Sequence, residues 1–344
     1  MHSLSIIGAG SWGTALSVVL AENCDKVVMW SREEDVTVSI RETKENAYYL
    51  PGLILPENVY ATSDLQEAVE GQDTFVLVVP SHAVRATIRL MSPYLKKGAL
   101  IVNCGKGLEE GTMARISTVL TEEAPDSQIA VLSGPNHAEE VSKKIPSATV
   151  VSAKSREVAE RVQDIFMTPF FRVYTNHDLI GVELAGALKN VIAVGAGISD
   201  GLGFGDNTKA ALMTRGITEI ARLGKRMGAE ILTFAGLAGI GDLVVTCTSR
   251  HSRNRSLGYE LGKGRSLPEI LEGMRMVAEG VRTTQVSKSL AEKYGVEMPI
   301  ASETYSVLFE GKNAREAVDD LMQRGPTNEK EDILAHNDSW NPGR

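Results

Sequence analysis

The segment IIGAGSWG, residues 6–13, contains Gly8, Gly10 and Gly13 in GxGxxG spacing. It follows an apolar run, SLSII, and opens a stretch with helical character, which is the context that a dinucleotide-binding turn requires. The first glycine permits a tight turn, the second lets the backbone approach a pyrophosphate, and the third lets helix and strand pack closely. Because a helix N-terminus also offers N–H groups to phosphates, the segment predicts a Rossmann unit at the start of the chain.

The pattern that surrounds this segment extends the same prediction over the first half of the chain. Apolar, β-branched runs typical of buried strands occur at 3–8, 26–30, 74–79, 99–104, 129–134, 148–153 and 171–175. Helix-like segments occur at 11–22, 64–71, 82–96, 111–123 and 155–167. Alternation of strands and helices predicts a largely parallel, doubly wound sheet.

After about residue 178 the pattern changes. Amphipathic helices are indicated at 206–229, 266–274, 279–295 and 314–324, with no comparable strand runs. We therefore expect an α/β dinucleotide-binding Rossmann domain over residues 1–178 and an all-helical substrate domain over residues 179–344. Its polar end of about 15 residues is expected to be a frayed tail.

Composition narrows the classes of function. The chain has 344 residues, 43% of them hydrophobic, and a formal net charge of -8, which argues against binding to nucleic acid or to an anionic membrane. Cys24, Cys104 and Cys247 are widely spaced, as free thiols of a reducing cytoplasm are. No signal peptide is apparent and no apolar run approaches 18 residues, so no membrane insertion is expected. The six histidines lack metal-ligand spacing, so no metal is expected.

The end of the second predicted strand bears on the choice of coenzyme. Ser31 and Arg32 follow KVVMW at the position where an NAD site usually carries an acidic residue for the ribose 2'-hydroxyl. Serine and arginine suit a 2'-phosphate instead, which favours NADP(H). Glu33 and Glu34 come directly afterwards, so NAD(H) stays possible, and Arg32 as an ordinary surface arginine is the alternative interpretation.

Polar residues also follow two later strands. Lys106 lies in NCGKGLE, after the run at 99–104, and LSGPNHAEE at 132–140 presents Gly134, Asn136 and the backbone around Ala138. The carboxyl ends of strands are where open α/β sheets bind ligands. These residues are candidates for a substrate site, although Lys106 is equally consistent with a loop lysine.

The segment 239–256 combines an acidic residue with the densest basic cluster of an acidic chain. Asp242 lies in a glycine turn, and the cluster comprises Arg250, His251, Arg253 and Arg255, with Ser252 and Asn254 between them. Arginine forks and small donors suit a phosphate dianion. The alternatives are a turn aspartate and a solvated helix start.

The stretch ELAGALKNVIAVGAGISDG, residues 183–201, is small or apolar except near Lys189 and Asn190. Its apolar residues fill more than one helical face, which predicts a buried helix, and lysine is almost never fully buried without a partner. Lys189 is therefore the strongest candidate for a functional cation, unless its stem reaches outward to solvent.

Taken together, these motifs resemble the NAD(P)-dependent glycerol-3-phosphate dehydrogenase family, in its bacterial cytosolic branch. The resemblance runs from IGAGSWGTALS through CGKGLE, LSGPNHAEE, GVELAGALKNV, GLGFGDNTKAAL, GLAGIGDLVVTCTS and HSRN to EGVRTT. It implies reversible reduction of dihydroxyacetone phosphate to sn-glycerol 3-phosphate, which supplies the glycerophospholipid backbone, by a cytoplasmic homodimer.

The resemblance also implies roles for individual residues. Lys189, in GALKN, corresponds to the catalytic acid and base, and its pKa is expected to lie below the usual value. The implied substrate contacts are Lys106, Gly134, Asn136, Lys189, Asp242, Ser252, Arg253 and Asn254. The implied coenzyme contacts, beyond the three glycines, are Ser11, Trp12, Arg32, Lys106, Ala138, Arg253, Val277 and Glu279.

One departure and two alternatives accompany the resemblance. Bacterial members usually carry a small hydroxyl residue where this chain has Asn136, so the role of that side chain is open. A related two-domain reductase of the β-hydroxyacid or 6-phosphogluconate type shares the Rossmann domain, helical domain and lysine. A non-catalytic NADP-binding redox sensor leaves Lys189 unexplained.

Overall fold

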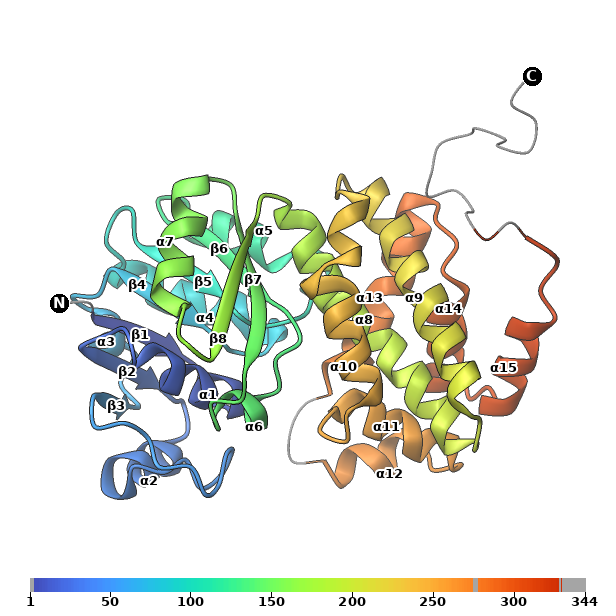
Figure 1. Ribbon diagram of the computed structural model, residues 1–344, viewed down its shortest axis with the longest axis horizontal. Coiled ribbons are helices and arrows are strands. Elements are labelled where there is room, and N and C mark those ends of the chain that lie inside the picture. Colours follow the sequence, from blue (N-terminus) through green and yellow to red (C-terminus); the bar gives the residue numbers. More distant parts are fainter. Residues whose placement is uncertain (1–2, 275–277, 328, 330–344) are drawn as a thin grey trace.

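The computed structural model describes residues 3–274, 278–327 and 329 (Figure 1). Within these residues it contains an eight-stranded sheet in the order β3-β2-β1-β4-β5-β6-β7-β8. The strands are β1 (Ser3–Ile7), β2 (Lys26–Trp30), β3 (Val59–Thr62), β4 (Thr74–Leu77), β5 (Leu100–Asn103), β6 (Gln128–Ser133), β7 (Ser147–Ala153) and β8 (Phe171–Asn176). Neighbouring strands run parallel except β6 and β7, which confirms the largely parallel sheet.

The strand order places a switch point at β1. β2 and β3 lie on one side of β1, and β4 and the later strands lie on the other. Connections therefore leave in opposite directions from the carboxyl ends of β1 and β4, and the crevice that results is where such sheets bind dinucleotides. The turn with Gly8 and Gly10 lies at this point.

Helices cover both faces of the sheet. α1 (Ser11–Leu20), α2 (Glu34–Thr43) and α7 (Arg156–Phe166) share one apolar core with the sheet. α3 (Leu65–Val69), α4 (Val84–Met91) and α5 (Ile116–Glu123) share the core on the opposite face, and the short α6 (Ala138–Val141) lies beside α1. This arrangement confirms the doubly wound prediction.

Two local predictions for this half need correction. β3 was not expected, because it is a four-residue edge strand with a half-exposed Tyr60 and so lacks the continuous apolar run of a central strand. The helix expected over 111–123 begins only at Ile116, since Gly111 and Met113 adopt positive φ angles of 79° and 60°, which a right-handed helix excludes.

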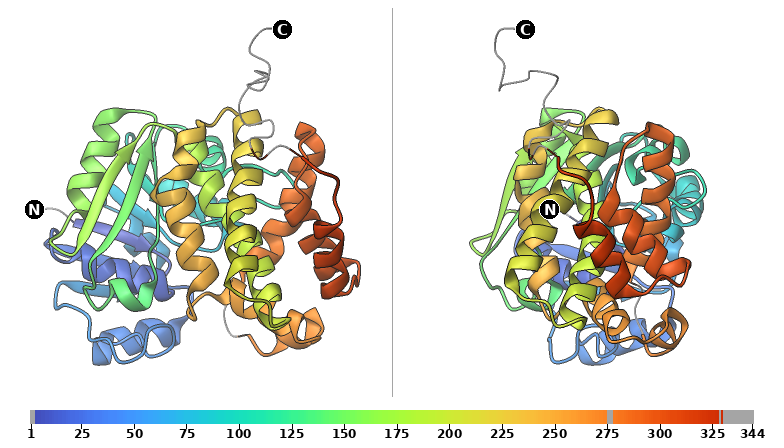
Figure 2. Two further views of the ribbon diagram at one scale, coloured as in Figure 1. Left: turned by 45° about the vertical axis from the view of Figure 1, so that its right-hand side comes forward. Right: turned by 90° about the vertical axis from the view of Figure 1, so that its right-hand side faces the viewer.

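The second half is helical, as expected. It contains α8 (Leu179–Gly201), α9 (Asp206–Arg226), α10 (Asp242–Thr248), α11 (Arg253–Gly262), α12 (Leu267–Glu272), α13 (Glu279–Tyr294), α14 (Pro299–Phe309) and α15 (Ala314–Met322). α15, in red, lies on the far side of the helices from the sheet (Figures 1 and 2). Three of these helices, α10, α11 and α14, were not among the predicted ones, and the expected tail falls in 330–344, outside the described residues.

α8 forms the core that joins the two halves. Val131 of β6 and Val150 of β7 share an apolar cluster with α8, and the other helices surround it. The helix is 23 residues long and, by length and composition alone, apolar enough to cross a membrane, although Glu183, Lys189 and Asn190 interrupt its apolar residues. Its most apolar 18-residue window is 94% buried inside the fold, as the core helix of a packed domain is.

Glycines set the close contact between α8 and α11. A Cβ on Gly197 would lie 2.0 Å from the carbonyl oxygen of Arg255, and one on Gly258 would lie 2.0 Å from that of Val194. No side chain fits at either position, so the two backbones approach each other directly. The contact fixes the N-terminus of α11, which carries the basic cluster, relative to the helix that carries Lys189.

Candidate active site

The carboxylate of Asp242 joins two lysines that are far apart in the sequence. Lys189 Nζ, from the middle of α8, lies 3.1 Å from Asp242 Oδ1. Lys106 Nζ, from the loop after β5, lies 2.6 Å from Asp242 Oδ2. Asp242 is the first residue of α10 and only 2% exposed. The structure therefore brings together three of the predicted substrate residues at the boundary between the sheet and the helices.

Lys189 is held inside this boundary and is not solvated. It is 4% exposed, and its Nζ donates to Thr246 Oγ1 at 2.6 Å and to Asn190 Oδ1 at 3.2 Å. The alternative in which its stem reaches solvent was therefore wrong. Burial, with a smaller contribution from Lys106, lowers the pKa of Lys189 to about 8 against the opposing effect of Asp242. An amine with this pKa carries a proton at neutral pH and releases it readily.

The loop after β6 lies beside this triad. Lys106 Nζ donates to the carbonyl oxygen of Gly134 at 2.9 Å. A Cβ on Gly134 would approach Thr149 Cα to 2.9 Å, so glycine is needed there. Asn136 donates from Nδ2 to the carbonyl oxygen of Ala148 at 3.0 Å, whereas its buried Oδ1 has no hydrogen-bond partner. Asn136 therefore keeps the acceptor Oδ1, and the second N–H of its amide group, for a ligand.

The same loop contains further unsatisfied polar atoms. Among the described residues, Ser133 Oγ and His137 Nε2 are buried without a hydrogen-bond partner, as Asn136 Oδ1 is. Burial also lowers the pKa of His137. Clusters of unpaired buried polar atoms are uncommon in folded proteins and indicate hydrogen-bonding capacity for a ligand. Sequence reasoning missed Ser133 and His137, although Ser133 directly precedes Gly134 at the end of a predicted strand and His137 follows three residues later.

The N-terminus of α11 supplies the predicted phosphate-binding residues. Ser252 caps the helix by accepting from the Arg255 N–H at 3.2 Å, and Arg253 is the first helical residue. Asn254 Oδ1 accepts from the Gly280 N–H at 2.9 Å, so the amide group of Asn254 can offer its N–H2 to a ligand. Helix N-termini attract anions through their N–H groups and dipole.

The arginines of the basic cluster differ in their surroundings. Arg255 is bound through Nε and Nη2 to Asp200 Oδ2 at 2.7 and 2.6 Å, which gives it a structural partner. Partial desolvation lowers the pKa of Arg253, and the carboxylates of Glu139 and Glu279 oppose that shift. Arg253 keeps an exposed surface, so it is the arginine of the helix start that a phosphate can reach.

The glycine turn fits a dinucleotide. Gly8 has a φ of 116° and would clash with the backbone of Val78 if it carried a Cβ, and a Cβ on Gly13 would lie 2.0 Å from the Gly8 carbonyl oxygen. In contrast, a Cβ on Gly10 would meet nothing within 4 Å. The first and third glycines therefore shape the turn, and the second leaves open space for a ligand at the N-terminus of α1.

The other predicted coenzyme residues lie around this turn or across from it. Trp12 Nε1 donates to the Cys104 carbonyl oxygen at 3.2 Å, and Ser11 Oγ donates to that of Tyr49 at 2.7 Å. Ala138 begins α6 and Glu279 begins α13. Arg32 follows β2 with a side chain that is 83% exposed and lies 3.2 Å from Glu33. Val277 is outside the described residues.

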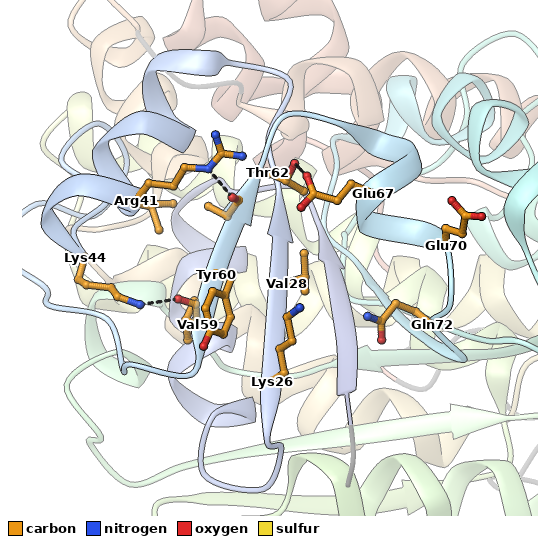
Figure 3. Close-up of a pocket in the computed structure, with 12 residues that line it drawn as sticks. Lys26, Val28, Arg41, Lys44, Val59, Tyr60, Thr62, Glu67, Glu70 and Gln72 are labelled. Atoms are coloured by element: carbon orange, nitrogen blue, oxygen red, sulfur yellow. Dashed lines mark hydrogen bonds between the residues drawn. The ribbon is translucent and has the colours of Figure 1, made fainter.

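Two surface hollows lie apart from these residues. One, of about 480 Å³, is bordered by β2, β3, α2 and α3. In it Lys44 and Arg41 donate to backbone carbonyl oxygens of β3, at Val59 and Ala61 (Figure 3). The other, of about 410 Å³, lies between β8 and the segment 233–238. None of the predicted site residues lines either hollow. Among the described residues, no group of three His, Cys, Asp or Glu side chains is placed to hold a metal ion.

Comparison with known proteins gives consistent matches over nearly the whole chain. Residues 3–159 match the family model described as the NAD-dependent glycerol-3-phosphate dehydrogenase N-terminus, and residues 178–319 match the model of its C-terminus. Glycerol-3-phosphate dehydrogenase [NAD(P)+] of Moorella thermoacetica is 56% identical over 96% of this chain and 98% of that protein. The enzyme of the same name from Pelotomaculum thermopropionicum is 54% identical over 96% and 95%.

A solved structure agrees with these matches. The crystal structure of glycerol-3-phosphate dehydrogenase from Coxiella burnetii superposes with a TM-score of 0.91 at 39% identity, over 94% of this chain and 99% of that one. The likeness spans both the sheet and the helices.

Proposed function

Because the chain belongs to the NAD-dependent glycerol-3-phosphate dehydrogenase family, we propose that it interconverts dihydroxyacetone phosphate and sn-glycerol 3-phosphate with Lys189 as the acid and base. The observation that carries the assignment of Lys189 is its burial at the Asp242 carboxylate that also binds Lys106. A buried amine with a lowered pKa beside a second cation is suited to donate a proton to a carbonyl oxygen.

The substrate is held, in this proposal, by groups on both sides of the triad. Arg253, Ser252 and Asn254 bind its phosphate through charge-assisted and neutral hydrogen bonds at the start of α11. Lys106, Gly134, Asn136 and Asp242 surround the carbon chain, and the unpaired Oδ1 of Asn136 accepts from a hydroxyl group. Asp242 also keeps both lysines in place, so the two cations can share a site despite their mutual repulsion.

The proposed coenzyme site is built around the glycine turn. The pyrophosphate is held at the N-terminus of α1 by the glycine turn, which comprises Gly8, Gly10, Ser11, Trp12 and Gly13. Arg32 binds the 2'-phosphate that distinguishes NADP(H) from NAD(H). The remaining proposed coenzyme contacts are Lys106, Ala138, Arg253, Val277 and Glu279. When bound, the nicotinamide supplies or accepts the hydride. NADP(H) is favoured and NAD(H) is the second coenzyme.

Proton transfer is the part of the reaction that belongs to the protein. In the reductive direction the Lys189 ammonium polarises the carbonyl oxygen at C2 and gives it a proton. In the oxidative direction the neutral amine removes the hydroxyl proton. Thr246 accepts from Lys189 Nζ at 2.6 Å and donates to the Asp242 backbone carbonyl, which orients the amine. We further propose a homodimer in the cytoplasm that supplies the glycerophospholipid backbone.

The two directions should depend on pH with opposite signs. Reduction needs the ammonium form of Lys189, so its kcat/KM should fall as pH rises through about 8. Oxidation needs the neutral amine, so its kcat/KM should rise through the same pH. Profiles of both directions between about pH 7 and about pH 9.5 measure this. Profiles that change with the same sign in both directions would exclude Lys189 as the titrating group.

Arg32 should determine the preference for coenzyme. Arg32→Ala is expected to weaken NADPH binding roughly 3- to 30-fold, because a charge-assisted contact to the 2'-phosphate is lost at an exposed position. NADH, which lacks that phosphate, should bind nearly unchanged. Fluorescence titration with both coenzymes provides the measurement, with the exposed Arg172→Ala as the control. Equal losses for both coenzymes would assign Arg32 to the structure or to the adenine instead.

The proposed reaction is tested by following NADPH absorbance with a panel of substrates. Dihydroxyacetone phosphate should be reduced, and 3-hydroxy acids and 6-phosphogluconate should not react in the corresponding oxidative assay. If 6-phosphogluconate or a 3-hydroxy acid were the preferred substrate, the protein would instead be one of the related two-domain dehydrogenases. Coenzyme binding with no turnover of any of these substrates would favour a redox sensor.

A further inference from the structure

The first turn of α13 is attached at two points to loops of the sheet. The carboxylate of Glu279 accepts from Ser81 Oγ at 2.8 Å and from the Ser81 N–H at 3.4 Å. One turn later, Arg282 lies 3.1 Å from Glu110. Ser81 follows β4 and Glu110 follows β5, so both contacts are at the carboxyl ends of strands beside the switch point. α13 is thus anchored on the coenzyme side of the molecule.

The same turn of α13 also contacts the substrate side. The Gly280 N–H donates to Asn254 Oδ1 at 2.9 Å, which fixes the orientation of that amide. A Cβ on Gly280 would lie 2.9 Å from both the Asn190 carbonyl oxygen and Asn254 Oδ1. α13 therefore sits directly on α8, next to the position of Lys189, and on the phosphate-binding start of α11.

Ser81 lies where these contacts converge. It is 8% exposed, and a Cβ on Gly107, the residue after Lys106, would lie 2.7 Å from Ser81 Cβ and 3.2 Å from Glu279 Oε2. Glu279 also exerts an electrostatic effect on Arg253. The Ser81 hydroxyl group thus connects the loop after β4 to the Glu279 carboxylate, and the Lys106 loop packs closely against Ser81 at Gly107.

We propose that Ser81 is a positioning residue, which holds the Glu279 carboxylate and so aligns Asn254 and Arg253 with the coenzyme crevice. The proposal rests on the proposed function. Its consequence is cooperative binding, since a coenzyme that orders the loop after β4 also orders the phosphate-binding turn through Glu279 and Gly280. Loss of the hydroxyl group should weaken this coupling more than it weakens either binding site alone.

The test compares Ser81→Ala with Ser92→Ala, an exposed serine after α4 whose Oγ donates only to the nearby Arg89 carbonyl oxygen. Calorimetry measures the affinity for glycerol 3-phosphate with and without saturating NADP+. In Ser81→Ala the increase in affinity caused by NADP+ should shrink roughly three- to tenfold, the size expected for the net contribution of one ordinary hydrogen bond. The KM for dihydroxyacetone phosphate should rise with little change in kcat, and Ser92→Ala should behave as the unmodified protein.

Three further measurements connect the effect of Ser81 to Glu279. In a Glu279→Ala background, Ser81→Ala should cause no additional loss of coupling. Glu279→Gln, which keeps the shape of the side chain, should reduce the coupling in the same direction, and hydrogen exchange of the first turn of α13 should accelerate in the coenzyme-free Ser81→Ala protein.

Several outcomes would overturn the proposal. These are unchanged coupling in Ser81→Ala, a full additional loss in the Glu279→Ala background, or a loss of affinity for coenzyme alone that is as large as the loss of coupling. An unmodified protein that does not turn over dihydroxyacetone phosphate would instead overturn the proposed function, and the positioning role with it.

Discussion

Replacing Lys189 with Met is expected to lower kcat for dihydroxyacetone phosphate reduction by roughly 10²–10⁴-fold. Methionine keeps most of the side-chain volume in a site that is 4% exposed, so the packing of α8 should persist. It removes the proton that Nζ donates and the charge that polarises the carbonyl group. Asp242 keeps its partner Lys106 at 2.6 Å, so no buried carboxylate is left without a cation.

Coenzyme binding and thermal unfolding serve as controls for this variant. NADPH should bind with near-normal affinity, because the glycine turn and Arg32 are untouched. Melting should stay cooperative. If Lys189 were only a structural partner of Asp242, the variant would lose stability and its folded fraction would keep a normal kcat.

Arg253→Ala should have the second largest effect, on KM. A charge-assisted hydrogen bond contributes about 1.5–3 kcal/mol, which corresponds to a rise of roughly 10- to 150-fold in KM for dihydroxyacetone phosphate. Unphosphorylated dihydroxyacetone should be affected much less, because it lacks the phosphate group that Arg253 is proposed to bind. Steady-state kinetics with both substrates provide the comparison.

A matched variant distinguishes direct phosphate binding by Arg253 from the general electrostatic effect of the basic cluster. Arg250→Ala removes an exposed charge of the same cluster two residues before the helix cap and should change KM less than Arg253→Ala does. Equal losses for the phosphorylated and unphosphorylated substrates in Arg253→Ala would show that this arginine does not bind the substrate phosphate.

The central strands of the sheet could be predicted from the sequence because they are buried on both faces. Such strands are continuous apolar runs, and the glycine turn marks where the first of them ends. β3 was missed for the opposite reason, since an edge strand with an exposed Tyr60 has no such run. α11 was missed because its packing on α8 depends on glycines such as Gly258, which have no hydrophobic periodicity.

The candidate site was predictable only in part. Lys189 was identifiable because a lysine in an apolar helix needs an explanation, and the structure places it beside Asp242 and Lys106. Thr246, which accepts from Lys189, gave no signal in the sequence, because a threonine one helical turn after an aspartate is ordinary. The proposed role of Ser81 depends on its hydrogen bond to Glu279, which lies 198 residues later in the sequence, and no local sequence pattern reveals such a contact.

The most direct test of the central claim is single-turnover reduction, in which the protein loaded with NADPH is mixed with excess dihydroxyacetone phosphate and the loss of NADPH fluorescence is followed. This measurement isolates the chemical step from product release. If Lys189 supplies the proton, the folded Lys189→Met protein should bind NADPH normally and lose fluorescence at least roughly 10²-fold more slowly than the unmodified protein. A folded Lys189→Met protein that oxidises NADPH at a near-normal rate in this experiment would contradict the assignment of Lys189 as the acid and base.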